Sequence, residues 1–172
     1  MEKSSVASRR FESVEHLQQR PGFLLRRAHQ ISVAIFEKEC AAVDLTPAQY
    51  GVLNVLGNSQ GIDQSQLSRS LGLDRVTVLR VAKGLEARGL ISRQPSQQDA
   101  RRLSLSLTAQ GETLLERAQP SVKTAFEALM SPFSAEELQT LTCLLNKLCT
   151  SLAGHARAEM ECQLGKNLRD PS

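Results

Sequence analysis

The chain has 172 residues, of which 41% are hydrophobic and only 3% are aromatic, with no Trp. That length suits one ordinary domain, and a core limited to Leu, Val, Ile and Ala favours packed helices over a β-sandwich. The formal net charge of +3 allows a polyanionic partner without requiring one, and no apolar run approaches the ~20 residues of a membrane-spanning helix, which excludes that class.

The first predicted element is a long helix that follows a polar arm. Residues 1–20 are polar with scattered apolar positions, so we expect a flexible N-terminal arm. The pattern changes at Pro21 and Gly22, after which apolar residues recur at steps of three and four: Leu24, Ala28, Ile31 and Ile35. This spacing predicts an amphipathic helix that continues to about Val43.

Two shorter helices are predicted next from their capping residues. Thr46 is a good N-cap and a proline suits the first helical position, so we expect a second helix over Pro47–Leu56. Asp63 is a good cap for a third helix over Gln64–Leu71. Gly72 is expected to end that helix.

A fourth helix and a hairpin complete this part of the chain. The helix is predicted from about Arg75 to Arg88, with a buried face of Val78, Val81, Ala82 and Leu85. The period then falls to two in Leu103–Leu107, which is typical of a strand with one buried face. Leu90–Arg93 is a shorter candidate strand. The polar stretch Gln94–Arg102 between the two predicts a hairpin with a long exposed tip.

Two long helices are expected at the C-terminal end. Thr108–Met130 is predicted to be helical, with Gly111 tolerated and Pro120 as a kink, or else as two shorter helices. Ser134–Glu137 resembles a capping box, and an apolar stripe follows on a last helix: Leu138, Leu141, Leu145, Leu148 and Leu152. We therefore expect one domain over residues 21–155, with a lobe at about 46–110, and a polar tail over 156–172.

The lobe carries the pattern of a helix-turn-helix. Apolar, small and turn residues occur where two short helices must cross closely, at Leu67, Ser68, Leu71, Gly72, Leu73 and Val78. The segments Leu85–Arg93, Asp99–Arg101 and Leu105–Thr108 together resemble the pattern of the MarR family, and Thr46–Tyr50 resembles the start of its second helix. The resemblance covers residues 22 to about 152.

The resemblance implies a fold and a function. The fold is mainly α with a small β-hairpin wing, a winged helix-turn-helix flanked by long dimerisation helices. The function is that of a cytoplasmic homodimer that binds double-stranded DNA at a palindromic operator, usually as a repressor. The Leu138–Leu152 stripe and the first helix offer more apolar surface than a small lobe can bury, so dimer contact is its expected use, although part of it can be intramolecular core.

The outward face of the fourth helix is the predicted recognition surface. It carries polar and basic residues suited to the major groove: Arg75, Thr77, Arg80 and Lys83. By resemblance Asp99 braces the wing and Arg101 reaches the minor groove, while Arg93 and Arg102 contact phosphates. Weaker candidates for the DNA backbone lie on the third helix: Ser65, Gln66, Ser68 and Arg69. The alternatives are a solvated helix face and a hairpin that is basic for solubility.

An effector site is expected between the first, second and fifth helices, where many members of this family bind phenolic or aromatic carboxylate ligands. Polar candidates are Arg26, Arg27, His29 and Gln30 on the first helix and Tyr50 on the second. The run Arg20–Arg27 is similar to a subgroup that regulates aromatic acid catabolism, with nicotinate-like compounds among the candidate ligands. Alternatively, His29 forms a hydrogen bond at the edge of the buried stripe.

The remaining chemistry in the sequence is sparse. The four cysteines lack the paired spacing of zinc sites, and no signal peptide is evident, so we expect no metal, no cofactor and a reducing cytosol. Redox sensing through Cys40 is an alternative to its role as an apolar filler, and Cys143 and Cys149 are interpreted as packing residues. Three scattered histidines and the lack of a nucleophile motif or phosphate loop argue against an enzyme. A winged helix that binds proteins instead of DNA would carry an acidic or apolar fourth helix.

Overall fold

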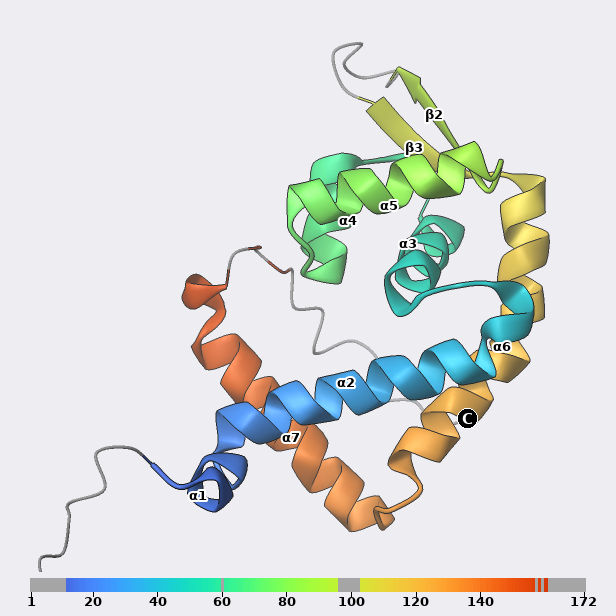
Figure 1. Cartoon of the computed structure of the whole chain (residues 1–172). Helices are drawn as coiled ribbons and strands as arrows, with labels where there is room; N and C mark the ends of the chain where they lie inside the picture. Colours follow the sequence, from blue (N-terminus) through green and yellow to red (C-terminus); the bar gives the residue numbers. More distant parts are fainter. Residues whose placement is uncertain (1–11, 60, 96–102, 157, 159, 161–172) are drawn as a thin grey trace, which may run out of the picture.

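The computed structural model describes residues 12–59, 61–95, 103–156, 158 and 160. Within these ranges no helix is long and apolar enough to cross a membrane. The chain runs through helices, 3-10 turns (η) and short strands (Figure 1) in this order: α1 (Val14–Gln18), α2 (Pro21–Glu39), η1 (Ala41–Val43), α3 (Pro47–Asn58), β1 (Ile62–Asp63), α4 (Gln64–Leu71), α5 (Arg75–Ala87), β2 (Ile91–Pro95), β3 (Leu103–Leu107), α6 (Ala109–Met130), α7 (Ala135–Ser151) and η2 (Ala153–His155).

The upper lobe in Figure 1 is a winged helix-turn-helix. Helices α3, α4 and α5 pack on one another and on a three-stranded antiparallel sheet of order β1-β3-β2. Strand β3 is central, with Leu105 opposite Ile62 of β1 on one side and opposite Arg93 of β2 on the other. Strand β2 is therefore an edge strand that pairs with β3 alone.

The core lies inside this lobe and is aliphatic, as the composition predicts. The largest fully buried side chains belong to Leu53, Leu67, Leu85, Leu105, Val52, Val78 and Cys40. They come from α3, α4, α5, β3 and the end of α2, so helices and sheet share one hydrophobic interior. Cys40 fills that interior as an apolar residue would.

The long helices form a second layer below the lobe. Helix α2 packs against α6, and α7 crosses α2 obliquely in Figure 1, with only sparse contact to the rest of the described protomer. All of α7 lies in the described part of the chain, and none of its residues is buried. Its exposed apolar side chains include Leu144, Leu145, Leu148 and Leu152, and α2 adds Leu24, Leu25 and Ile31. The apolar stripe predicted on the last helix is therefore present: Leu138 and Leu141 are half-buried, and the protomer leaves Leu145, Leu148 and Leu152 exposed.

Gly111 has a more important role than the sequence predicts. A Cβ atom at this position would lie 2.1 Å from the carbonyl oxygen of Leu90, at the point where the chain leaves α5. The same carbonyl accepts a hydrogen bond from the Thr108 amide (3.1 Å). The prediction that a glycine is merely tolerated here is wrong, because α6 begins too close to the backbone of Leu90 for any side chain.

Some predicted boundaries are confirmed and others shift: the first helix, predicted to about Val43, ends at Glu39 and is followed by the turn η1. The third helix and Leu103–Leu107 match, and the second helix runs two residues further. Helix α6 continues through Pro120, so the alternative of two helices is wrong. Leu90 lies outside β2 because its amide donates a hydrogen bond to the Leu85 carbonyl (3.0 Å) at the C-terminal end of α5. The sequence analysis did not predict β1, nor α1 inside the expected arm.

Candidate nucleic-acid interface

The crossing of α4 and α5 is fixed by short-range hydrogen bonds. Asp63 and Gln66 form a reciprocal capping box at the start of α4, with both amide-to-side-chain distances at 2.8 Å. Gly72 ends α4 with a φ of +61°, a conformation that favours glycine. The hydroxyl of Ser68, which is buried, donates to the carbonyl of Leu73 across the turn (2.6 Å). The small residue expected at Ser68 thus holds the turn together.

The first turn of α5 is capped by Asp74. This carboxylate accepts the backbone amide of Thr77 (2.9 Å) and the Thr77 hydroxyl (2.7 Å). The two Thr77 hydrogen bonds, the hydroxyl one foremost, lower the pKa of Asp74 below its usual range. Thr77 was predicted to contact DNA, and its hydroxyl hydrogen is already donated to Asp74. Its oxygen remains the atom that could accept a bond from a base or a protein group.

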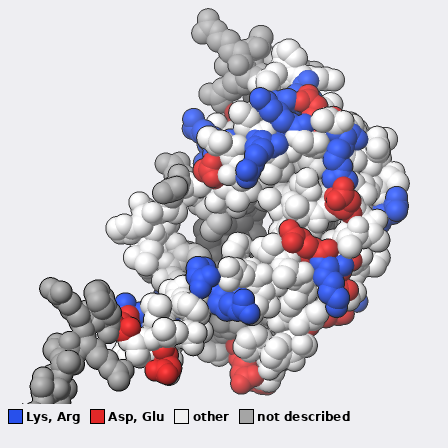
Figure 2. Space-filling model, in the orientation of Figure 1, with Lys and Arg blue, Asp and Glu red and all other residues white. Residues whose placement is uncertain are grey.

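The remaining outward side chains of α5 form a basic face. Val78, Ala82 and Leu85 are buried on one side of the helix. The three predicted cations on the other side, Arg75, Arg80 and Lys83, are all exposed. Figure 2 shows Lys and Arg side chains gathered over the upper lobe, where α5 lies in front. Val76, which the sequence pattern does not single out, is 76% exposed on the same helix. Its signal was an apolar residue two positions after the N-cap, outside the buried period.

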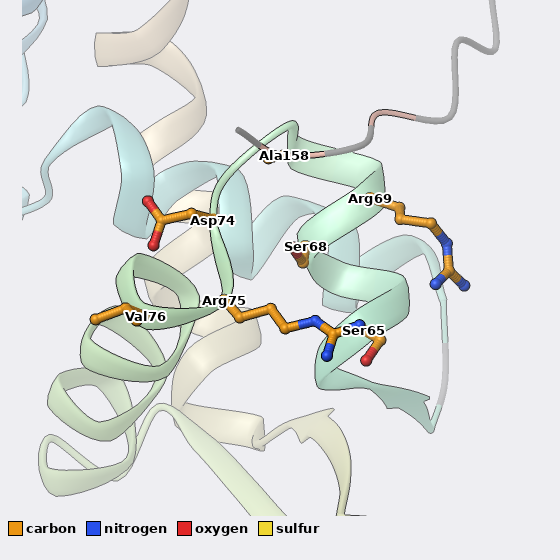
Figure 3. A pocket seen from close by; sticks show the side chains of 7 residues that line it. All are labelled: Ser65, Ser68, Arg69, Asp74, Arg75, Val76 and Ala158. Carbon is orange, nitrogen blue, oxygen red and sulfur yellow. The ribbon is translucent and has the colours of Figure 1, made fainter. Parts of the chain in front are cut away.

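A groove between α4 and the start of α5 brings four of the predicted residues together (Figure 3). It has a volume of about 400 Å³ and is lined by Ser65, Ser68, Arg69, Asp74, Arg75, Val76 and Ala158. In Figure 3 the Arg75 side chain extends from α5 toward Ser65, and Arg69 projects from α4 beyond it. Two positive side chains and a hydroxyl at one groove suit a phosphate of the DNA backbone.

The wing is only partly described. Asp99, Arg101 and Arg102 lie outside the described residues. Arg93 lies on β2, and its guanidinium is paired with the carboxylate of Glu86, on the last turn of α5. Glu86 is not among the residues predicted from the sequence. Its signal was an acidic residue near a helix C-terminus, where the helix dipole disfavours negative charge.

The predicted effector residues fall into two separate places. On α2, Arg26, Arg27, His29 and Gln30 are all exposed, and Arg26 donates to Gln30 (3.2 Å) while its guanidinium lies over the Phe23 ring. Tyr50 is half-buried on α3 with its ring 5.8 Å from that of Phe36. Phe36 lies ten residues after Arg26, which is about 15 Å along the helix axis. The protomer therefore does not bring Tyr50 and Arg26 to one point.

The cysteines differ in their surroundings. Cys40 is fully buried at the end of α2, and burial, followed by the charge of Glu39, raises the pKa of its thiol. A buried thiol with a raised pKa forms little thiolate, the species that reacts with oxidants. Cys143 and Cys149 are both exposed on α7, so the protomer alone does not bury them as packing residues. Among the described residues no group of three His, Cys, Asp or Glu side chains could hold a metal ion.

Comparison with known proteins places this architecture in a family. The sequence profile of the MarR family matches residues 43–102. The HTH-type transcriptional repressor NicR of Pseudomonas putida is 30% identical over 130 residues, which are 76% of this chain and 82% of that protein.

Two solved structures are similar over nearly their whole length. The transcriptional repressor CouR, bound to a 23-mer DNA duplex, is 30% identical with a TM-score of 0.73, covering 81% of this chain and 99% of that one. Bordetella bronchiseptica BpsR, whose DNA binding is regulated by 6-hydroxynicotinic acid, is 29% identical with a TM-score of 0.74, covering 77% and 95%. The chain therefore belongs to the MarR family of transcriptional regulators.

Proposed function

We propose that this protein is a homodimeric transcriptional repressor that binds a palindromic operator through α5 and the wing and leaves it when an aromatic carboxylate binds. The observation that carries the proposal is the exposed basic face of α5, with Arg75, Arg80 and Lys83 opposite a buried apolar face. The similarity to CouR, a repressor solved on a DNA duplex, supports it. No catalytic role is included, since the relatives named above are regulators, and a protein that acts on chromosomal DNA would work in the cytoplasm.

The α5 face suits direct recognition of bases. An arginine can bind O6 and N7 of guanine together, and an exposed apolar side chain such as Val76 can contact the methyl group of thymine. Arg75, with Ser65 and Arg69 at the groove beside it, suits the flanking phosphates. A winged helix specialised for protein binding would instead expose an acidic or apolar α5, and this helix exposes three cations.

Recognition of an operator by the basic face of α5 needs a dimer. One recognition helix reads only a few base pairs, whereas a two-fold dimer presents two helices to half-sites about 34 Å apart. The uncovered apolar side chains of α7 and α2 supply a surface for the second copy. The dimer would bury the leucines that a protomer leaves exposed, and it would set the separation of the two α5 helices.

Selection of duplexes from a random pool, followed by anisotropy titrations at two salt concentrations, tests the DNA proposal. A palindrome with half-sites one helical turn apart is the expected product. Arg80→Gln should weaken binding to the selected duplex by about 1–3 kcal/mol and relax the preference at one base pair, if it binds a guanine. Arg117→Gln on the exposed side of α6 is the matched control and should bind as the wild type does. A wild-type protein that binds no duplex at low salt refutes the proposal.

The effector part of the proposal is tested separately. BpsR, whose regulation involves 6-hydroxynicotinic acid, supports an aromatic carboxylate as the ligand class. Such a ligand can release DNA only if it binds the DNA-incompetent dimer more tightly than the competent one. Calorimetric titration with benzoate, 4-hydroxybenzoate, nicotinate and 6-hydroxynicotinate should give heat with at least one compound, which should also weaken the DNA complex. No heat and no weakening with all four would remove this part alone.

A further inference from the structure

Among the described residues, an ion pair links the wing to the recognition helix, in addition to the packing of Ile91 of β2 in the core beside α5. Glu86 lies on the last turn of α5, and Arg93 is the third residue of β2. Both Nε and one terminal nitrogen of Arg93 donate to the same carboxylate oxygen, Oε2 of Glu86, and the Nε distance is 2.7 Å. The pair spans the turn in which the chain leaves the helix and enters the wing.

The surroundings of the pair make Arg93 a poor phosphate ligand. Its side chain is only 18% exposed, and that of Glu86 is 37% exposed. The hydrogen bond from Arg93 lowers the pKa of Glu86, with smaller contributions from the charges of Arg93 and Lys83, so the carboxylate stays ionised at neutral pH. The positive charge of Arg93 is therefore neutralised from the protein side, unlike the exposed charges of Arg75 and Arg80.

Without Arg93, the position of Glu86 at the end of α5 would be unfavourable. The C-terminal end of a helix carries partial negative charge, so an acidic residue there opposes the helix dipole. At the other end of the pair, β2 is an edge strand whose ladder hydrogen bonds go to β3 alone. The pair thus supplies a tie between this edge strand and α5 that the sheet itself does not provide.

We propose that Arg93 is a positioning residue that, with Glu86, holds the wing at a fixed place relative to the recognition helix, and that it is not a phosphate contact. The tie would keep strand β2 and the exposed face of α5 at a fixed separation, so that both can meet one duplex together. This inference rests on the proposed function for its DNA part. It replaces the expectation that Arg93 adds affinity by neutralising a phosphate.

Charge variants separate the two roles of Arg93. The variants are Glu86→Gln, Arg93→Gln and a double variant, Glu86→Arg with Arg93→Glu, which exchanges the two charges (the exchange variant). The control is Glu116→Gln, which removes one negative charge from the exposed side of α6. Each is titrated onto the duplex selected by the wild type, between about 50 and 200 mM salt. A positioning role predicts that both single variants weaken binding by about fivefold with an unchanged salt slope, and that the exchange restores affinity.

A phosphate contact predicts a different pattern. Arg93→Gln would then reduce the salt slope by about 0.9, and Glu86→Gln would bind more tightly because a negative charge beside the DNA is gone. Either result, or an exchange variant that binds no better than the single variants, overturns the inference. Melting temperatures of all variants are measured first, so that loss of fold is distinguished from loss of affinity.

Hydrogen exchange of the DNA-free protein tests the tie independently of DNA binding. The amides of β2 should exchange faster in both single variants and return toward the wild-type rate in the exchange variant, because a loosened edge strand opens more often. Unchanged β2 protection in both single variants overturns the inference even if the protein binds DNA. If the wild type binds no duplex, the proposed function fails. The hydrogen-exchange rates of the β2 amides still decide whether the ion pair ties the strand to α5.

Discussion

Replacement of Gly111 by alanine should destabilise the protein through one backbone contact. The new Cβ would lie 2.1 Å from the Leu90 carbonyl oxygen, and real Cβ contacts essentially never fall below 3.0 Å, so the two atoms must part by about 0.9 Å. That carbonyl cannot move freely, because it accepts the Thr108 amide (3.1 Å), while the Thr108 hydroxyl donates to the Gly89 carbonyl (2.7 Å). The start of α6 or the end of α5 has to shift.

The expected change in unfolding free energy combines two destabilising effects and one stabilising effect. Overpacking of a tight site costs about 1–3 kcal/mol, and loss of the hydrogen bond to Leu90 adds about 1 kcal/mol. Alanine is favoured over glycine inside a helix by about 1 kcal/mol, which offsets part of this. The expected net loss is about 1–3 kcal/mol of unfolding free energy. For a chain of this size the melting temperature should fall by about 3–10 °C.

Gly84→Ala is the matched control, because it makes the same change in a helix without a neighbour to meet. Gly84 is exposed on α5, and a Cβ there has no heavy atom within 4 Å. This variant should gain about 0.5–1 kcal/mol from helix propensity alone. Thermal and urea unfolding are followed by circular dichroism at one fixed protein concentration, because dimer formation makes stability depend on concentration. Equal shifts for the two variants, or a Gly111→Ala protein as stable as the wild type, would refute the packing argument.

Three further predictions concern the stability of the turn and the cap, and the reactivity of Cys40. Ser68→Ala should lower the unfolding free energy by about 1–2 kcal/mol in urea, because the turn carbonyl at Leu73 loses its buried donor; an unchanged midpoint would contradict this. The pKa of Asp74 is lowered in the folded protein, so its capping contribution to stability is present above about pH 4 and is lost as the pH falls through the folded pKa. The difference in melting temperature between the wild type and Asp74→Ala should therefore narrow in acid. A gap that stays constant would count against the cap. Finally, a thiol reagent followed by mass spectrometry should modify Cys40 only on unfolding, because its thiol is buried and has a raised pKa; rapid modification of Cys40 in the native protein would revive the redox hypothesis.

The sequence by itself determined the local structure of the recognition unit. Caps and turn residues specify the ends of α4 and α5, because Asp63, Gly72 and Asp74 act on neighbours three to five residues away. The alternation in Leu103–Leu107 specifies β3 for the same reason, since the pleat of a strand repeats every two residues. Interactions of this short range are visible in the order of the residues, so the basic face of α5 followed from periodicity alone.

Only the tertiary structure decided what depends on contacts between distant segments. The partner of Arg93 is Glu86, and this turns an expected phosphate contact into a tie between strand and helix. The need for glycine at position 111 comes from the approach of α6 to the Leu90 carbonyl. Residue type and spacing do not encode which backbone atom will lie within 3 Å, because that distance is set by how the helices and the sheet pack together.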